Sequence, residues 1–184
     1  MINNSKLEYL KSINGMDLYR FKPTIGHYFF EDWIGFEEDI EKHSKRQRIR
    51  MLIELLWGGY SVYYAGQGEA ILGYVLVACG GRRITCSKKT DIVLGPYYTL
   101  AAKRGHGIMF CLLENILHEL EIPYESAYCY IKKDNVASIK VASKCGFEIV
   151  GQAEMHGILH KLYLTQNNSS KFYIVKYKND KRKG

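Results

Sequence analysis

The stretch from Asp91 to Leu120 constrains the fold most, because its hydrophobic period changes part-way along. Residues 92–98 carry the aliphatic, β-branched and aromatic side chains of a strand. From Met109 onward, apolar residues return every three or four positions, which predicts a helix. The period changes at residues 103–107, where two glycines stand. We therefore predict a strand that continues through a glycine turn directly into a helix.

This turn, Lys103-Arg104-Gly105-His106-Gly107, has the chemistry of a diphosphate site. The first amides of a helix lack intrahelical partners and carry the positive end of its dipole. Glycines permit positive φ and close approach of a ligand, and the two basic residues add charge. A dinucleotide fingerprint would need glycine at Phe110, and no GxxxxGK[ST] sequence occurs. The alternative is a helix whose glycines serve packing and whose basic residues are solvated.

A second segment, NVASIKVASKCGF at residues 135–147, predicts a short helix. Asn135 is a suitable N-cap, and Gly146 stands just after the C-cap. Together, RGHGIM and NVASIKVASKCGF resemble motifs A and B of the GCN5-related N-acetyltransferase (GNAT) superfamily. The resemblance covers residues 91–151 by pattern and the flanks by order of elements. One departure is Ala102, which stands where the family has Gln or Arg.

The resemblance implies an α/β fold with a mixed, mainly antiparallel sheet flanked by helices, and acetyl-CoA as the acyl donor. In the family the central strand diverges from the strand after the helix, so the pantetheine arm binds exposed backbone groups as an added strand would. By position, Asn135 and Ser138 lie near the other side of the arm. The arm is assigned to the backbone of Tyr98, Thr99 and Leu100, and the diphosphate to the amides of Arg104, Gly105, His106, Gly107, Ile108 and Met109.

The resemblance also suggests catalytic residues, because an ammonium group with a pKa of ~10 must lose a proton before it attacks a thioester. Asp91 aligns with the glutamate general base of the histone-acetylating branch, although it could simply begin a strand. In many members a motif B tyrosine protonates the leaving thiolate. The residue at that position of this chain is Ala142. Protonation then falls to water, Ser138, or a tyrosine such as Tyr98 or Tyr130.

Several functions stay open at this point. We expect an acetyltransferase whose acceptor is a small-molecule amine, such as an amino sugar or another metabolite. Ala142 favours a catalytically silent CoA-binding module instead, and a protein or peptide amine is a further alternative. The net charge of +7, with basic clusters at 42–50 and 176–183, suggests RNA binding. We do not expect a nucleic-acid partner, because no aromatic RNA motif accompanies either cluster.

The 184 residues suit one domain over residues 1–175, followed by a basic tail at 176–184. The first residues lack the pattern of a signal peptide, and the longest apolar run, residues 70–79, is too short to span a bilayer. We therefore expect a cytoplasmic protein without a membrane partner. Five cysteines without a CxxC pair suggest reduced thiols. The oligomeric state stays open, a homodimer included.

The remaining segments follow the order of elements in the family. His156 and His160 are four residues apart but have no third ligand, so we expect no metal site. The aromatic residues Phe29, Phe30, Trp33 and Tyr60 either face the acceptor or belong to the core. We predict strands at residues 16–21, 61–65, 70–79, 126–131 and 147–153, helices at 31–43 and 45–57, and a closing hairpin of 159–164 with 172–177.

Overall fold

A computed structural model describes residues 7–29, 45–119, 123–157 and 160–179. The chain forms two compact units, Met1–Val77 with Pro96–Leu112, and Ala78–Gly95 with Leu113–Gly184. Three elements contribute to both units: β4 (Ala70–Cys79), β5 (Ile92–Thr99) and α2 (Ile108–Glu119). The expectation of one domain over residues 1–175 stays a prediction.

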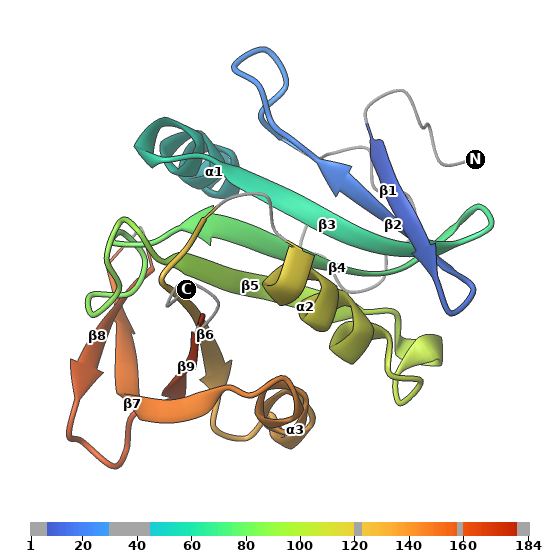
Figure 1. The fold of residues 1–184 in the computed structure, drawn as a ribbon. Coiled ribbons are helices and arrows are strands. Elements are labelled where there is room, and N and C mark those ends of the chain that lie inside the picture. Colours follow the sequence, from blue (N-terminus) through green and yellow to red (C-terminus); the bar gives the residue numbers. More distant parts are fainter. Residues whose placement is uncertain (1–6, 30–44, 120–122, 158–159, 180–184) are drawn as a thin grey trace. The chain divides into compact units, whose positions relative to one another are not determined.

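The first unit is built on an antiparallel sheet with the order β1-β2-β3-β4-β5 (Figure 1). β1 (Glu8–Ile13) pairs with β2 (Met16–Phe21), which pairs with β3 (Tyr60–Gln67). Between β1 and β2, Asn14 and Gly15 have φ of 51° and 75°, as a two-residue hairpin turn requires. We did not predict β1, although Asn-Gly between apolar residues is a strong hairpin signal.

Helix α1 (Lys45–Trp57) confirms the predicted helix at 45–57 and buries Met51. The predicted helix at 31–43 lies outside the described residues. The hairpin of β3 and β4 is confirmed, although its turn falls at residues 68–69 rather than 66–68. The main buried residues of β2 and β3 are Leu18, Phe21, Val62, Tyr64 and Ala65.

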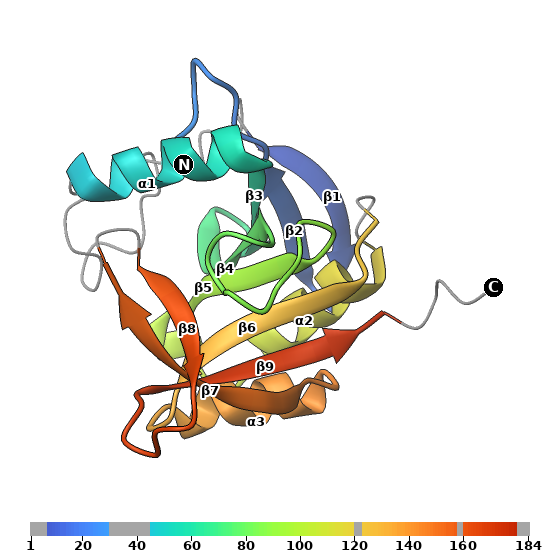
Figure 2. The same ribbon diagram turned by 90° about the vertical axis from the view of Figure 1, so that its left-hand side faces the viewer.

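The second unit has the strand order β5-β6-β9-β7-β8, and Figure 2 shows β9 beside β6. β5 and β6 run parallel, whereas the other neighbours run antiparallel. The predicted mixed, mainly antiparallel sheet is therefore confirmed. Its elements besides β5 are β6 (Ser126–Lys132), α3 (Val136–Lys144), β7 (Glu148–His156), β8 (Lys161–Thr165) and β9 (Phe172–Lys178).

The predicted closing hairpin of 159–164 with 172–177 is wrong. β8 pairs with β7, and β9 lies between β6 and β7. The physical reason is burial: Ile174 and Val175 of β9 are almost completely buried, and two neighbouring strands cover them better than one. β8 keeps exposed side chains and lies at the end of the strand order. β9 also extends to Lys178, so residues 176–178 belong to a strand.

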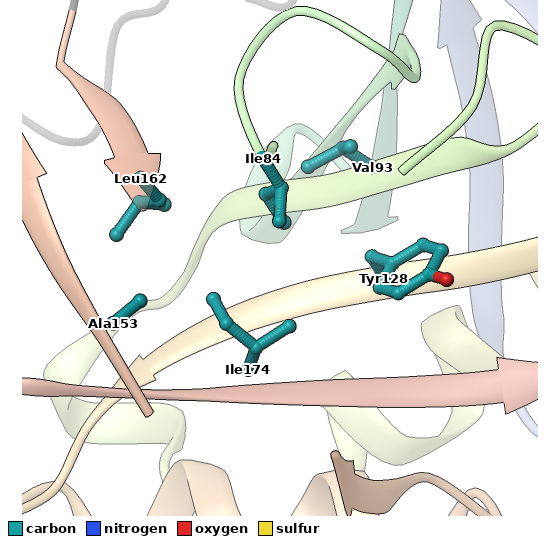
Figure 3. Packing of buried hydrophobic residues seen from close by; sticks show 6 residues of the cluster. All are labelled: Ile84, Val93, Tyr128, Ala153, Leu162 and Ile174. Atoms are coloured by element: carbon teal, nitrogen blue, oxygen red, sulfur yellow. The ribbon is translucent and has the colours of Figure 1, made fainter. Parts of the chain in front are cut away.

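One core cluster of the second unit takes one side chain from a loop and one from each of the strands β5 to β9. Figure 3 shows how these side chains converge from the loop before β5 and from five strands. Such convergence fixes the loop at residues 80–91 to the sheet, because Ile84 is fully buried. The cluster consists of Ile84, Val93, Tyr128, Ala153, Leu162 and Ile174.

Two further features concern membranes and metals. Among the described residues, no helix has both the length and the apolar character needed to cross a bilayer. His156 ends β7 and His160 lies in a turn, so the two are not on one helix. Within the same residues, no group of three or more His, Cys, Asp or Glu side chains is placed to hold a metal ion.

Candidate active site

The glycine turn connects β5 to α2 as predicted. A short 3-10 helix, η2 (Ala101–Lys103), comes first, and the amide of Arg104 donates to Ala101 O (3.3 Å). Gly105 and Gly107 then have φ of 82° and 75°. A Cβ added to either glycine would meet no atom within 4 Å. The glycines are therefore required for their left-handed backbone rather than for space.

The residue before α2 has no side chain that could cap the first amides of the helix. Gly107 is the residue before the helix, and its carbonyl accepts the first helical bond, from the amide of Cys111 (2.9 Å). The amides of Ile108, Met109 and Phe110 consequently have no intrahelical acceptor. Gly107 has no side chain that could cap them, and the first turn contains no acidic residue. This helix start attracts an anion.

Arg104 is held against β5 rather than extended into solvent. Its Nε donates to Thr99 O (3.2 Å), and its guanidinium lies 5.4 Å from the centre of the Tyr98 ring. Tyr98 stacks on Tyr74 with 6.3 Å between ring centres, and Tyr74 lies 6.2 Å from Tyr64. Arg104 is thus the exposed end of an aromatic row across three strands, and its charge is fixed beside the turn.

The register of β5 against β4 changes by one residue along its length. The amide of Gly80 donates to Asp91 O (2.8 Å). Further along, the amide of Leu100 donates to Leu72 O (2.8 Å). The two bonds are eight residues apart on β4, at 72 and 80, but nine residues apart on β5, at 100 and 91. The extra residue is a β-bulge in β5, and Gly95, with φ of 120°, is where the backbone departs from ordinary strand geometry.

The parallel ladder between β5 and β6 ends beside this bulge, with Leu94 opposite Cys129. Gly95 comes next and is buried. Its carbonyl accepts a hydrogen bond from Nη1 of Arg83 (2.7 Å), a side chain that is only 3% exposed. Arg83 was not predicted as a functional residue, because an arginine in a basic loop is expected to be a solvated charge.

The backbone groups predicted to hold the pantetheine arm are not equivalent. The amide of Leu100 is directed to β4, where Leu72 accepts it. Because backbone groups alternate between the two edges of a strand, the amide of Thr99 is directed to the opposite edge. The carbonyl of Thr99 already accepts from Arg104. The structure therefore favours the amide of Thr99 over that of Leu100 for a ligand that adds to this edge.

Asp91 lies just before β5 and is 4% exposed. Its Oδ2 accepts from the amide of Lys88 (2.7 Å), so the carboxylate also shapes the loop before the strand. Lys176 lies in its electrostatic field: the pKa of Lys176 is raised, mainly by a hydrogen bond to Tyr128 and less by the charge of Asp91. The catalytic role of Asp91 stays a prediction.

Comparison with solved structures shows which proteins share this architecture. The ribosomal-protein-S5-alanine acetyltransferase of Vibrio fischeri has a TM-score of 0.59 at 17% identity, over 96% of this chain and 100% of that chain. The microcin C7 self-immunity acetyltransferase MccE, solved with acetyl-CoA and AMP, has 0.57 at 14%, over 91% and 94%. A GNAT-family acetyltransferase of Streptococcus pneumoniae has 0.51 at 16%, over 72% and 75%. The chain has the GNAT fold. No protein-family model and no curated protein sequence matches it.

The segment that resembles motif B forms α3 as predicted, and its N-cap oxygen is already used by the helix. Oδ1 of Asn135 accepts from the amide of Ser138 (3.1 Å), so this oxygen serves the helix itself. Gly146 has φ of 81° after the last turn, as a helix end of this type requires. Ala142 is 2% exposed, and no hydroxyl stands at the family's tyrosine position. Asn135 and Ser138 belong to the second unit, whereas Tyr98 to Met109 belong to the first.

The aromatic residues considered for the acceptor side are core residues where the structure describes them. Phe29 and Tyr60 are each 5% exposed. Phe29 carries the guanidinium of Arg48 over its ring, and the hydroxyl of Tyr60 donates to the carbonyl of Tyr28. Burial raises the pKa of Tyr60, so this hydroxyl is no base near neutral pH. Phe30 and Trp33 lie outside the described residues.

Proposed function

We propose that this protein transfers the acetyl group of acetyl-CoA to a primary amine. The observation that carries the proposal is the start of α2, where the first helix amides follow a turn of two left-handed glycines and the residue before the helix has no capping side chain. This is the anion-binding end that a CoA diphosphate needs, and it stands on the GNAT fold. Arg104, fixed by Tyr98 and Thr99, adds a positive charge at the same point.

The pantetheine arm in this proposal binds along β5, chiefly to the amide of Thr99. In the reaction, the neutral amine nitrogen attacks the thioester carbon, the carbon–sulfur bond breaks, and the CoA thiolate leaves. The substrate ammonium first passes one proton to Asp91 through a water molecule, and the nitrogen loses a second proton to water as the amide forms. Because Ala142 removes the usual donor, the thiolate takes its proton from water, Ser138 or the hydroxyl of Tyr98.

The acceptor we propose is a small-molecule amine, such as an amino sugar, and the reaction is placed in the cytoplasm. The likeness to a ribosomal-protein acetyltransferase favours a second candidate, the amino terminus of a protein. Both acceptors present the same nucleophile, so they differ in what surrounds the amine. The experiment incubates the protein with acetyl-CoA and either an amino-sugar panel or peptides that begin with alanine. Thiol release and product mass identify the acceptor class.

This experiment also separates the alternative functions. A silent CoA-binding module would bind CoA in calorimetry yet release no thiol with any amine. A basic RNA-binding protein would bind RNA with strong salt dependence and show little response to CoA. Absence of CoA binding would refute the proposed function as a whole.

Asp91→Asn tests the proposed base. Asparagine keeps a side-chain oxygen that can accept from the amide of Lys88, so the loop should persist. An amide cannot take up a proton, and we expect turnover to fall about 100-fold, the lower range for loss of a general base. CoA affinity, measured by calorimetry, should not change. Full turnover across the pH range would assign Asp91 to the loop alone.

A further inference from the structure

The loop between β4 and β5 holds a buried arginine that the proposed reaction does not use. Arg83 is 3% exposed, and its backbone is fixed to β8. The amide of Leu162 donates to Arg83 O (2.8 Å), and the amide of Thr85 donates to Leu162 O (3.1 Å). The neighbouring Ile84 is fully buried in the core of the second unit (Figure 3). The position of Arg83 is thus set by the sheet rather than by its own charge.

The side chain of Arg83 reaches the end of the parallel ladder. Nη1 donates to Gly95 O (2.7 Å) and lies within 3.4 Å of the hydroxyl of Tyr130. The guanidinium lies 5.9 Å from the centre of the Tyr130 ring, which packs edge-on against Phe172 at 6.1 Å. The charge is therefore held between a strand carbonyl and an aromatic pair.

The bonded carbonyl is the one at the β-bulge. A buried carbonyl requires a hydrogen-bond partner, and in a continuous ladder β6 would supply it. Here the ladder ends at Leu94, and the partner of Gly95 is the Arg83 side chain. Burial of an arginine is costly unless its donors are used. The bond to Gly95 O uses one of these donors.

We propose that Arg83 is a positioning residue for the acyl donor. By bonding Gly95 O it fixes the bulge and ends the β5–β6 ladder, which aligns the following backbone of β5, up to Thr99, for the pantetheine arm. Arg83 does not touch the reacting atoms and acts through Gly95. This inference rests on the proposed function, because it requires that CoA binds along β5.

The test compares two ligands on Arg83→Met, which keeps the length of the side chain but removes its charge and donors. CoA carries the pantetheine arm, whereas 3′-phosphoadenosine 5′-diphosphate carries only the end that binds the α2 turn. We expect calorimetry to show CoA affinity at least about tenfold lower, and affinity for the truncated ligand within about twofold of the unmodified protein. Arg83→Lys, which keeps one donor for Gly95 O, should recover most of the CoA affinity.

Backbone hydrogen exchange gives a second measurement, which would not change if the role of Arg83 were purely structural. In the unmodified protein, CoA should slow exchange at Thr99, and the truncated ligand should not. In Arg83→Met this effect of CoA should be lost, while protection of the core strand β9 is kept.

Each remaining outcome decides the proposal. Equal loss for both ligands, or no loss for either, would overturn the role of Arg83 while leaving CoA binding intact. If the unmodified protein binds neither ligand, the proposed function itself fails. Arg83→Gln provides a second variant that is neutral yet polar. If neither Arg83→Met nor Arg83→Gln folds, Arg83 is a core residue only and the proposal is rejected.

Discussion

The starts of α2 and α3 are built in opposite ways, although both were predicted to contact the same ligand. At α3 the side chain of Asn135 accepts from the amide of Ser138, so the helix satisfies its own end. At α2 the preceding residue is Gly107, which has no side chain to do so. The difference teaches that a helix start is open to a ligand when the preceding residue cannot cap it, and not simply because its dipole is present.

Among the variants that test this difference, Gly107→Val should reduce CoA affinity the most. Valine does not tolerate a φ of 75°, so the turn must rearrange and the amides of α2 lose their direction. Left-handed backbone costs a non-glycine residue ~1–2 kcal/mol, and we expect CoA affinity in calorimetry to fall about 5- to 30-fold.

Gly157→Val provides the matched control for this strain. Gly157 has φ of 72° and, like Gly107, open space around an added Cβ. It lies just after β7, outside both helices. A similar loss of thermal stability with unchanged CoA affinity is expected. If Gly107→Val binds CoA normally, the diphosphate does not bind at α2.

Asn135→Ala tests the other side of the comparison. Loss of an asparagine cap costs about 1 kcal/mol of the free energy of unfolding, which urea denaturation measures. Asn135→Asp should retain the cap and restore the stability. The prediction for CoA is a change of less than about twofold, because the Asn135 oxygen is used by Ser138. If the loss in free energy of CoA binding exceeded the loss in free energy of unfolding, Asn135 would be assigned to the ligand site.

Arg104→Ala should have the smallest effect in free energy. An exposed guanidinium beside a phosphate contributes ~0.5–1 kcal/mol, so CoA affinity should fall about three- to fivefold and become less dependent on salt. Tyr98→Phe is the control, because it keeps the ring under Arg104 and removes only the hydroxyl. Unchanged affinity with lower turnover in Tyr98→Phe would identify that hydroxyl as the proton donor. An unchanged salt profile in Arg104→Ala contradicts the placement of its charge.

The sequence predicted the features that depend on local spacing. The period change at residues 103–107, the two glycines and the Asn135 cap are each set by residues a few positions apart, and all three are confirmed. The fold class followed from the motif resemblance and is confirmed by the structure.

Features that depend on distant pairing could not be predicted in this way. The ladder position of β9 is decided by which strands bury Ile174, and no local pattern encodes that choice. The sequence alone indicates that Arg83 is a surface charge. Its partner, Gly95 O, is recognised only when the end of the β5–β6 ladder is known. The bulge in β5 appears only when the register against β4 is counted. β1 is different, because its Asn14-Gly15 signal was present and was overlooked.

The place of β9 has a consequence for how the chain is made. β6 and β7 precede β9 in the sequence, yet β9 is the strand that joins them. During synthesis from the amino terminus, the edge of β6 stays unpaired while residues 133–171 are added. Such late pairing between distant segments slows folding and exposes strand edges to other chains. We therefore expect nascent chains that stop before Phe172 to aggregate or to depend on chaperones, even though every element of the α2 turn is already present.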